Sequence, residues 1–312
     1  MRLLLLNDLH LGPGDDRPAY ARPAIEEAKF DAVVTVGDVI DENRDHAKSA
    51  AAGERYERVG RAFYEFLHDE YDLPILVVPG NHDPLDCAER LTEGLDRAVV
   101  LHERAVDAAE LGLSDLDGFA FAGWGCEQFD QAPEIRYTEF SATNPVEDAT
   151  TATIDHLAAE RANEVESVAG RYLDGDADGD DVADALGVAG RAKARLVDQL
   201  ETLEDRYETL YSLATADERV LLFAHVPPFD VAFDHHHSGS GLYGRVRSGS
   251  LALKHAIRRA SPHAAFGGHT HQYGIDTVAT DSGDRYVVNA GAPGVAVVEV
   301  ETDPGVLNVR TA

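Results

Sequence analysis

Polar side chains that bind metals follow several short apolar runs of this chain. The first run ends in Asp8 and His10, two residues apart, and a later run ends in His269 and His271 with the same spacing. Further candidates stand directly behind other apolar runs: Asp38, Asn81, His82 and His225. Because a strand that ends in a tight turn presents its next side chains at the carboxyl edge of a sheet, we expect these groups to gather at one edge.

This mixture of carboxylates, imidazoles and one amide suits a transition metal better than magnesium, which prefers oxygen ligands. We expect manganese, with iron, zinc or nickel as alternatives. The donors outnumber what one ion usually takes, so a pair of divalent ions about 3.5 to 4 Å apart is expected, with Asp38 between them. Two such ions activate a shared water and hold the oxygens of an in-line displacement at phosphorus. The predicted chemistry is phosphoester hydrolysis through a metal-bridging hydroxide.

The apolar runs that must position these residues read as buried strands. They are "RLLLLND", "DAVVTVGD", "ILVVPGNHD", "FAFAGWG", "RVLLFAHVP", "AAFGGHTH" and "RYVVNAGAPG". Near-continuous apolar runs suit strands covered on both faces, and helical stretches such as residues 56–71 suit crossovers between them. Residues 294–300 and 306–309 are typical of a closing pair of strands. The pattern predicts a layered α/β fold in which sheet packs on sheet, with helices outside.

Residues 133–217 interrupt this rhythm with two long stretches of helical spacing, separated by the acidic segment "DGDADGDD". We expect an inserted helical hairpin in a catalytic domain formed by residues 1–132 and 218–312. The hairpin is interpreted as a cap over the site, with a dimerisation arm as the alternative, because a leucine and tyrosine stripe over 196–210 needs a partner. The acidic segment begins like a calcium loop, but Ala185 stands where a bidentate glutamate is required, so a solvated turn is expected.

The composition is strongly acidic, with 57 Asp and Glu against 27 Lys and Arg, and only four of the basic residues are lysine. A net charge of -30 makes the compact chain repel itself unless salt screens the charges. This favours a cytoplasmic protein of a high-salt organism, such as a halophilic archaeon, over an acidic mesophilic protein. Nucleic acid is disfavoured as a partner but stays open, since high salt weakens phosphate contacts. Neither a membrane span nor a signal peptide is expected, and Cys87 and Cys126 fit small buried residues.

Five stretches together resemble the motifs of the calcineurin-like metallophosphoesterases. They are "DLH" at 8–10, "GD" at 37–38, "GNHD" at 80–83, "AHVPP" at 224–228 and "GGHTH" at 267–271. Their order, spacing and strand context match, and the resemblance covers both ends of the chain except the insert. It implies a four-layer αββα sandwich of two mixed sheets flanked by helices, in agreement with the strand pattern.

The resemblance also implies roles for single residues. One ion is expected on Asp8, His10, Asp38 and His271, and the other on Asp38, Asn81, His225 and His269. His82 is expected to contact the phosphate and protonate the leaving oxygen, with Asp83 orienting it. His235, His236 and His237 lie ten or more residues past a ligand, where they rim the phosphate pocket or form a solvated loop.

The expected substrate is a phosphodiester or phosphomonoester of a small molecule or nucleotide. The protein-phosphatase branch carries an arginine soon after its second motif and "GNHE" as its third, whereas this chain has "GDVIDEN" and "GNHD". One alternative is a nuclease related to the double-strand-break repair enzymes, whose "D-x-H-L-G" opening the chain shares. Another is a scaffold that keeps the fold without catalysis, although such relatives lose ligands. The oligomeric state stays open.

Overall fold

The computed structural model describes residues 1–14, 29–41, 50–113, 116, 118–127, 134–135, 151–235, 247–301 and 307–311. Within these residues the chain forms two sheets of six strands each, one packed on the other. The first sheet has the order β12-β11-β1-β2-β3-β4. Its strands are β1 (Arg2–Asn7), β2 (Ala32–Val36), β3 (Ile75–Val78), β4 (Ala98–Val100), β11 (Gly294–Val300) and β12 (Leu307–Thr311).

The second sheet has the order β5-β6-β7-β8-β10-β9. Its strands are β5 (Arg104–Asp107), β6 (Phe119–Trp124), β7 (Arg219–Ala224), β8 (Ala264–Gly267), β9 (Tyr273–Val278) and β10 (Arg285–Ala290). Both sheets are mixed: β1, β2, β3 and β4 run parallel, as do β6, β7, β8 and β10, while the outer pairs are antiparallel. The carboxyl ends of the parallel strands therefore share one edge in each sheet.

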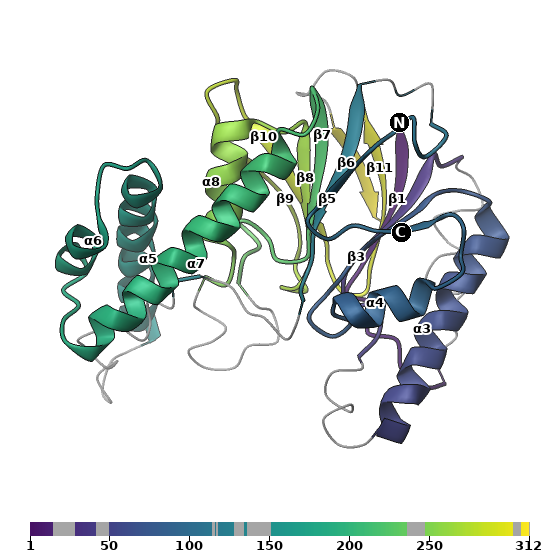
Figure 1. The fold of residues 1–312 in the computed structure, drawn as a ribbon, viewed down its shortest axis with the longest axis horizontal. Coiled ribbons are helices and arrows are strands. Elements are labelled where there is room, and N and C mark those ends of the chain that lie inside the picture. The colour runs from purple at the N-terminus through teal and green to yellow at the C-terminus, as the bar shows by residue number, and fades with distance from the viewer. Residues whose placement is uncertain are drawn as a thin grey trace.

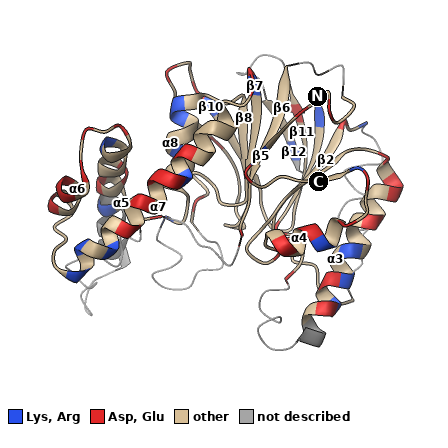
Figure 2. Ribbon diagram, in the orientation of Figure 1, with Lys and Arg blue, Asp and Glu red and all other residues tan. Residues whose placement is uncertain are grey.

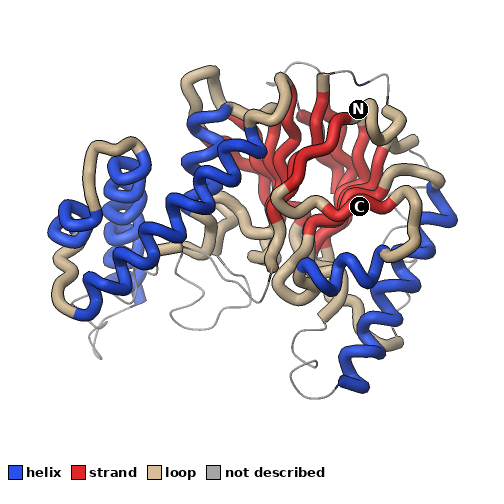
Figure 3. Tube along the Cα trace, in the orientation of Figure 1, coloured by secondary structure: helices blue, strands red, loops and turns tan. Residues whose placement is uncertain are grey.

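Helices cover the outer face of each sheet, so that strands occupy the centre of the molecule (Figure 3). On the first sheet lie α3 (Ala50–Tyr71) and α4 (Leu85–Thr92), and on the second lie α7 (Arg191–Ala214) and α8 (Leu251–Ala260). Two further helices, α5 (Thr151–Leu173) and α6 (Gly179–Ala185), extend from this layer at the left of Figure 1.

Successive side chains of the central strands point to opposite faces of the sheet, and this alternation produces the layers. In β1, Leu3 and Leu5 face the second sheet, while Leu4 and Leu6 face the side of α3 and its buried Phe63. Each fully buried Leu of this kind contributes about 1.5 to 3 kcal/mol from loss of apolar surface to water. The expected four-layer αββα sandwich of two mixed sheets is confirmed.

The region between β6 and β7 contains three described helices instead of a simple hairpin. The short α6 lies between the two long ones, and the acidic segment supplies its N-cap: Asp178 accepts hydrogen bonds from the backbone N–H of Asp180 and Asp181. Leu196, Leu200 and Leu203 of the predicted apolar stripe are at most 1% exposed. They belong to one core cluster with apolar residues of α5 and α6, so the chain itself covers this stripe.

Charged residues are distributed over the outer helices and loops (Figure 2), while the sheets between them are mostly uncharged. Both cysteines are buried, and they do not form a disulfide. Ser250 caps α8, accepting a hydrogen bond from the backbone N–H of Leu253. Among the described helices, none combines the length and the apolar character that a membrane crossing requires.

Candidate metal centre

The predicted donors follow the carboxyl ends of parallel strands in both sheets. Asp8, Asp38 and Asn81 come after β1, β2 and β3 of the first sheet. His225 and His269 come after β7 and β8 of the second. Because the two sheets pack face to face, these edges meet, and donors that lie far apart in the sequence become neighbours.

The backbone holds several donors in an unusual conformation. Five of them have φ in the left-handed region: Asp8 at 50°, His10 at 45°, Asp38 at 52°, His269 at 68° and His271 at 62°. Such conformations cost about 1 to 3 kcal/mol each and persist where the surrounding fold enforces them, which is typical of functional sites. The turns therefore direct these side chains toward the site, and the strained backbone lowers local stability.

Two glycines of the motifs are required by close packing. A Cβ on Gly37 would overlap the His225 ring, and a Cβ on Gly80 would overlap the backbone and carboxylate of Asp38. The turns after β2 and β3 thus approach the donors more closely than any other residue type permits.

The first cluster of donors joins Asp8, His10 and His271, whose ligating atoms all lie within 4.8 Å of one another. Nε2 of His10 lies 2.9 Å from Nε2 of His271, and the latter lies 3.8 Å from Oδ1 of Asp8. Nε2 of His10 is also 3.9 Å from Oδ2 of Asp38. Lone pairs of nitrogen and oxygen therefore converge on one point, as a cation requires.

The second cluster joins Asp38, His225 and His269 in the same way. Oδ1 of Asn81 lies 2.9 Å from Nε2 of His225 and 2.9 Å from Nδ1 of His269. Nε2 of His225 is 3.4 Å from Oδ2 of Asp38. The seven predicted metal ligands thus form two groups, and Asp38 stands between them.

Burial and mutual attraction set the charges of these groups. Burial raises the pKa of Asp8 to about 6, although the neighbouring His225 opposes this. Burial would also raise the pKa of Asp38 and lower that of His225, but their attraction outweighs it in both. The pKa of Asp38 is lowered, and that of His225 rises to about 10. The cluster therefore favours positive charge, and a cation bound there requires His225 to release its proton.

Neighbouring polar groups orient the donors. Nδ1 of His225 lies 3.0 Å from the carbonyl oxygen of Val36, which leaves Nε2 facing Asn81. Nδ2 of Asn7 donates to Oδ2 of Asp8 at 2.7 Å and to Oδ1 of Asn289 in the other sheet at 3.2 Å. Such contacts fix the orientation of metal ligands.

Asp83 occupies a different place from the one predicted. Its carboxylate accepts hydrogen bonds from the backbone N–H of Asp38, Val39 and Gly80, each at 2.8 or 2.9 Å. The carboxylate beside the His82 ring is instead that of Asp41, whose Oδ1 lies 2.8 Å from Nδ1 of His82. Asp83 therefore ties the second motif to the third, and Asp41 is positioned to orient the imidazole.

Sequence reasoning missed Asp41, although it lies in the "GDVIDEN" stretch three residues after Asp38. Its Oδ1 is also 3.6 Å from Nδ1 of His10. Burial would raise the pKa of Asp41, but hydrogen bonds with the two histidines outweigh this and lower it. The sequence feature that could have identified Asp41 is a carboxylate three residues after a predicted metal ligand.

His235 lies at the edge of this region. Its backbone carbonyl accepts a hydrogen bond from Nε2 of Gln272, the residue after His271, and its Nδ1 is 3.3 Å from Oδ1 of Asp234. His236 and His237 lie outside the described residues. Contact of this loop with substrate stays a prediction.

Fold and site together define an αββα protein with a site for two divalent metal ions. Comparison with known families agrees: residues 1–273 match the calcineurin-like phosphoesterases. The chain belongs to the calcineurin-like phosphoesterase family, and it is a phosphoesterase enzyme.

Solved structures resemble this chain at low sequence identity. One such structure shares the fold at 15% identity with a TM-score of 0.51, covering 99% of this chain and 98% of its own. A phosphopantetheinyl hydrolase from Mycobacterium tuberculosis is 15% identical with a TM-score of 0.45, covering 93% of this chain and 89% of its own. A dimetal phosphatase from Danio rerio is 15% identical with a TM-score of 0.47, covering 100% and 95%. No curated protein matches the chain.

Proposed function

We propose that the chain hydrolyses a phosphoester at two divalent ions held by the seven clustered donors. The first ion is assigned to Asp8, His10, Asp38 and His271, and the second to Asp38, Asn81, His225 and His269. One observation supports this assignment: Asp8, His10 and His271 form one group and Asp38, His225 and His269 another, and Oδ2 of Asp38 lies 3.9 Å from Nε2 of His10 and 3.4 Å from Nε2 of His225. Four imidazoles, two carboxylates and an amide fit manganese, which we propose, or iron, zinc and nickel.

When bound, the ions polarise the phosphoryl oxygens and activate the attacking water. The chain's own residues supply the remaining chemistry. His82 is nine-tenths buried beside the first cluster, with its ring edge-on to His10 at 4.9 Å between centroids. With Nδ1 turned to Asp41, the ring uses Nε2 to contact the phosphate and protonate the leaving oxygen.

The substrate is proposed to be a phosphodiester or phosphomonoester of a small molecule or nucleotide. The stretch "GDVIDEN" supports this, since it lacks the arginine that protein phosphatases carry there.

A substrate panel tests the proposal. Purified protein with added manganese is expected to hydrolyse bis(p-nitrophenyl) phosphate or p-nitrophenyl phosphate, and EDTA should abolish the activity. Asp96→Asn, an exposed change of equal charge, serves as the control beside Asp38→Asn. Hydrolysis of single-stranded DNA alone would favour the nuclease alternative. Full activity in Asp38→Asn would refute the assignment of the site.

We further propose that the insert at 133–217 is a cap that selects substrates. It begins after β6, whose carboxyl end lies at the same edge of the sheet as the carboxyl end of the parallel strand β7, which His225 follows. The apolar residues of α5 and α6 cover the leucine stripe, so the stripe no longer needs a second copy of the chain as its partner. This removes the main argument for a dimerisation arm. Because α7 belongs to the layer that covers the second sheet, the test replaces only α5 and α6, residues 151–185, by a glycine-serine linker. This change is expected to spare metal binding and small diesters while changing the preference among larger substrates. An unchanged substrate profile with a changed oligomeric state would support the arm instead.

We also propose that the protein works in a high-salt cytoplasm. A net charge of -30 supports this, with acidic groups spread along the exposed helices (Figure 2). Raising ionic strength from about 0.1 M to about 1 M shortens the Debye length from about 10 Å to about 3 Å and weakens this repulsion. The urea midpoint should therefore rise with potassium chloride. A midpoint that is independent of salt would contradict the proposal.

A further inference from the structure

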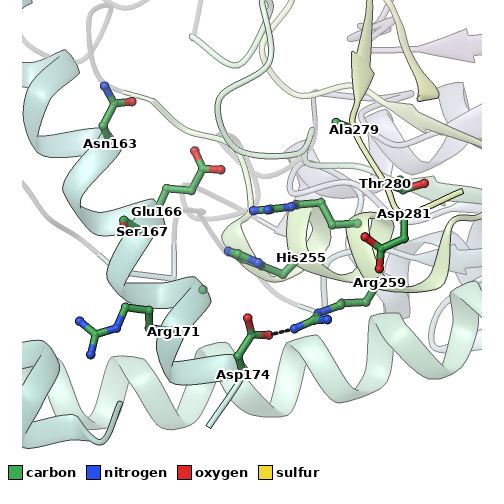
Figure 4. A pocket seen from close by; sticks show the side chains of 12 residues that line it. Asn163, Glu166, Ser167, Arg171, Asp174, His255, Arg259, Ala279, Thr280 and Asp281 are labelled. Carbon is green, nitrogen blue, oxygen red and sulfur yellow. Dashed lines mark hydrogen bonds and ion pairs between the residues drawn. The ribbon is translucent and has the colours of Figure 1, made fainter. Parts of the chain in front are cut away.

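A cleft of about 690 Å³ lies apart from the metal centre, between α5, α8 and the turn after β9. None of its lining residues belongs to the two donor clusters. Its volume falls in the range of small-molecule sites, but its walls are polar. Figure 4 shows side chains of α5 on one side and those of α8 and the turn on the other.

His255 of α8 is the unusual residue of this cleft. Its side chain is buried, with 6% of the residue exposed, and its ring points toward α5 (Figure 4). Nε2 is buried and has no hydrogen-bond partner within the described part of the chain. Leaving such an atom unpaired costs about 1 to 3 kcal/mol, so its retention needs a reason. Gly170 of α5 permits the approach, because a Cβ there would lie 2.9 Å from Cε1 of the ring.

Three arginines line the same cleft, and two of them have no acidic partner in the part of the chain that the structure describes. Arg259 forms an ion pair with Asp174 (Figure 4). Arg171 hydrogen-bonds only a backbone carbonyl, and Arg258 forms no ion pair among the described residues.

The carboxylates of the cleft are mostly occupied. Asp174 is taken by Arg259, and Glu166 lies 2.7 Å from Nζ of Lys254. Asp281 is the remaining acidic residue of the lining. In a second surface cleft, between α3 and α4, Arg90 and Arg61 are paired with Glu57 and Glu65, while Arg58 has no ion pair among the described residues.

We propose that this cleft binds a small polar metabolite through a phosphate group. Two guanidinium groups, the Nε2–H of His255 and the hydroxyl of Ser167 offer more donors than the two oxygens of a carboxylate use, and they suit the three terminal oxygens of a phosphate. Arginine is the preferred residue for such contacts because its planar donors match the oxygens in pairs. The volume beyond one phosphate accommodates a hydrophilic body, and the described lining contains no Phe, Tyr or Trp on which a base would stack.

Calorimetric titration of the metal-loaded protein tests the site. The probe is the phosphonate analogue of glycerol 3-phosphate, whose C–P bond phosphoesterases do not cleave. Two probe molecules are expected per chain, one at the metal centre and one in the cleft. The double variant Arg171→Gln/Arg258→Gln should bind only one probe molecule, or bind the second with an affinity lowered about tenfold for each guanidinium removed, as expected for charge-assisted hydrogen bonds.

A matched control separates local contacts from general charge. Arg191→Gln/Arg195→Gln makes the same charge change at exposed positions of α7 and should bind two probe molecules. His255→Leu removes the donor while keeping the apolar bulk. It should weaken the cleft site without lowering the free energy of unfolding, since it deletes an unpaired buried polar atom.

Three outcomes would overturn the proposal. Wild-type affinity at both sites in the arginine double variant would refute the cleft as the second site. Equal loss in the α7 control would assign the effect to net charge. Inorganic phosphate that binds the cleft as tightly as the phosphonate would show that free phosphate, and no larger metabolite, is the ligand.

Discussion

The pairing of Asp41 with His82 predicts a coupled loss of activity. The two side chains approach to 2.8 Å, and Asp41 is 32% exposed, so water screens part of the attraction. Charge-assisted hydrogen bonds are worth about 1.5 to 3 kcal/mol. Asp41→Asn keeps the shape of the side chain and removes its charge, so we expect a loss of about 1 to 2 kcal/mol, or about 5- to 30-fold in kcat.

The effect should depend on the leaving group. A general acid contributes about 10²- to 10⁴-fold, and least where the leaving group departs easily. His82→Ala and Asp41→Asn should therefore both lose more activity on an alkyl diester than on a nitrophenyl diester. Because Asp41 acts through His82, the double variant should be no slower than His82→Ala alone.

Kinetics and metal analysis on the three variants check this reasoning. Asp96→Asn is a matched control, since its Oδ1 lies 2.8 Å from Nε2 of His68 in another Asp–His pair, on the exposed surface. Elemental analysis must show two metal ions per chain in Asp41→Asn, because Asp41 also lies near His10. A double variant whose loss equals the product of the single losses would refute the coupling.

Three further predictions concern the shared ligand Asp38, the packing of Gly80 and the buried His255. Asp38→Ala should lose both metal ions and Asn81→Ala chiefly one, by elemental analysis; two tightly bound ions in Asp38→Ala would contradict the shared ligand. Gly80→Ala should unfold at clearly lower urea than wild type, because its Cβ overlaps Asp38, whereas Gly179→Ala, with ordinary contacts, should not. Burial and nearby cations lower the pKa of His255 to about 4, so below about pH 6.5 the unfolded chain takes up a proton that the folded chain refuses and stability is lost. Between pH 7 and pH 5, the free energy of unfolding measured by urea titration should therefore fall by about 1 to 2 kcal/mol less in His255→Gln than in wild type. An identical fall in both proteins would contradict the lowered pKa.

The donors could be predicted because each follows an apolar run, and strand ends are local features of a sequence. Asp38 and His225 needed no knowledge of the partner strands. The role of Asp41 could not be predicted without the partner strands, because it arises only when the loop after β2 meets the loop after β3. Asp83 shows the same limit: it adjoins His82 in the chain, yet its carboxylate binds the backbone of residues 38, 39 and 80.

The elements missed by the apolar pattern are short or half-exposed. β4 and β5 have three and four residues, and β9 is an edge strand whose Tyr273 and Ile275 are 52% and 43% exposed. α4 has eight residues and no side-chain cap. The leucine stripe showed that a partner was needed, but only the structure identifies α5 and α6 as that partner. The short helix α6 was hidden because its first turn is acidic and reads as loop.

The arrangement of the donors depends on both sheets at once. Left-handed φ values at Asp8 and His269 cost free energy that local sequence does not offset. Compensation comes from across the sheets: the backbone N–H of His269 donates to both oxygens of Asp8 at 2.9 and 3.0 Å, and Asn7 bridges to Asn289. Disrupting these contacts would relax the turns on both sides together, so the geometry of the metal centre is a property of the packed sandwich, and neither sheet alone can hold it.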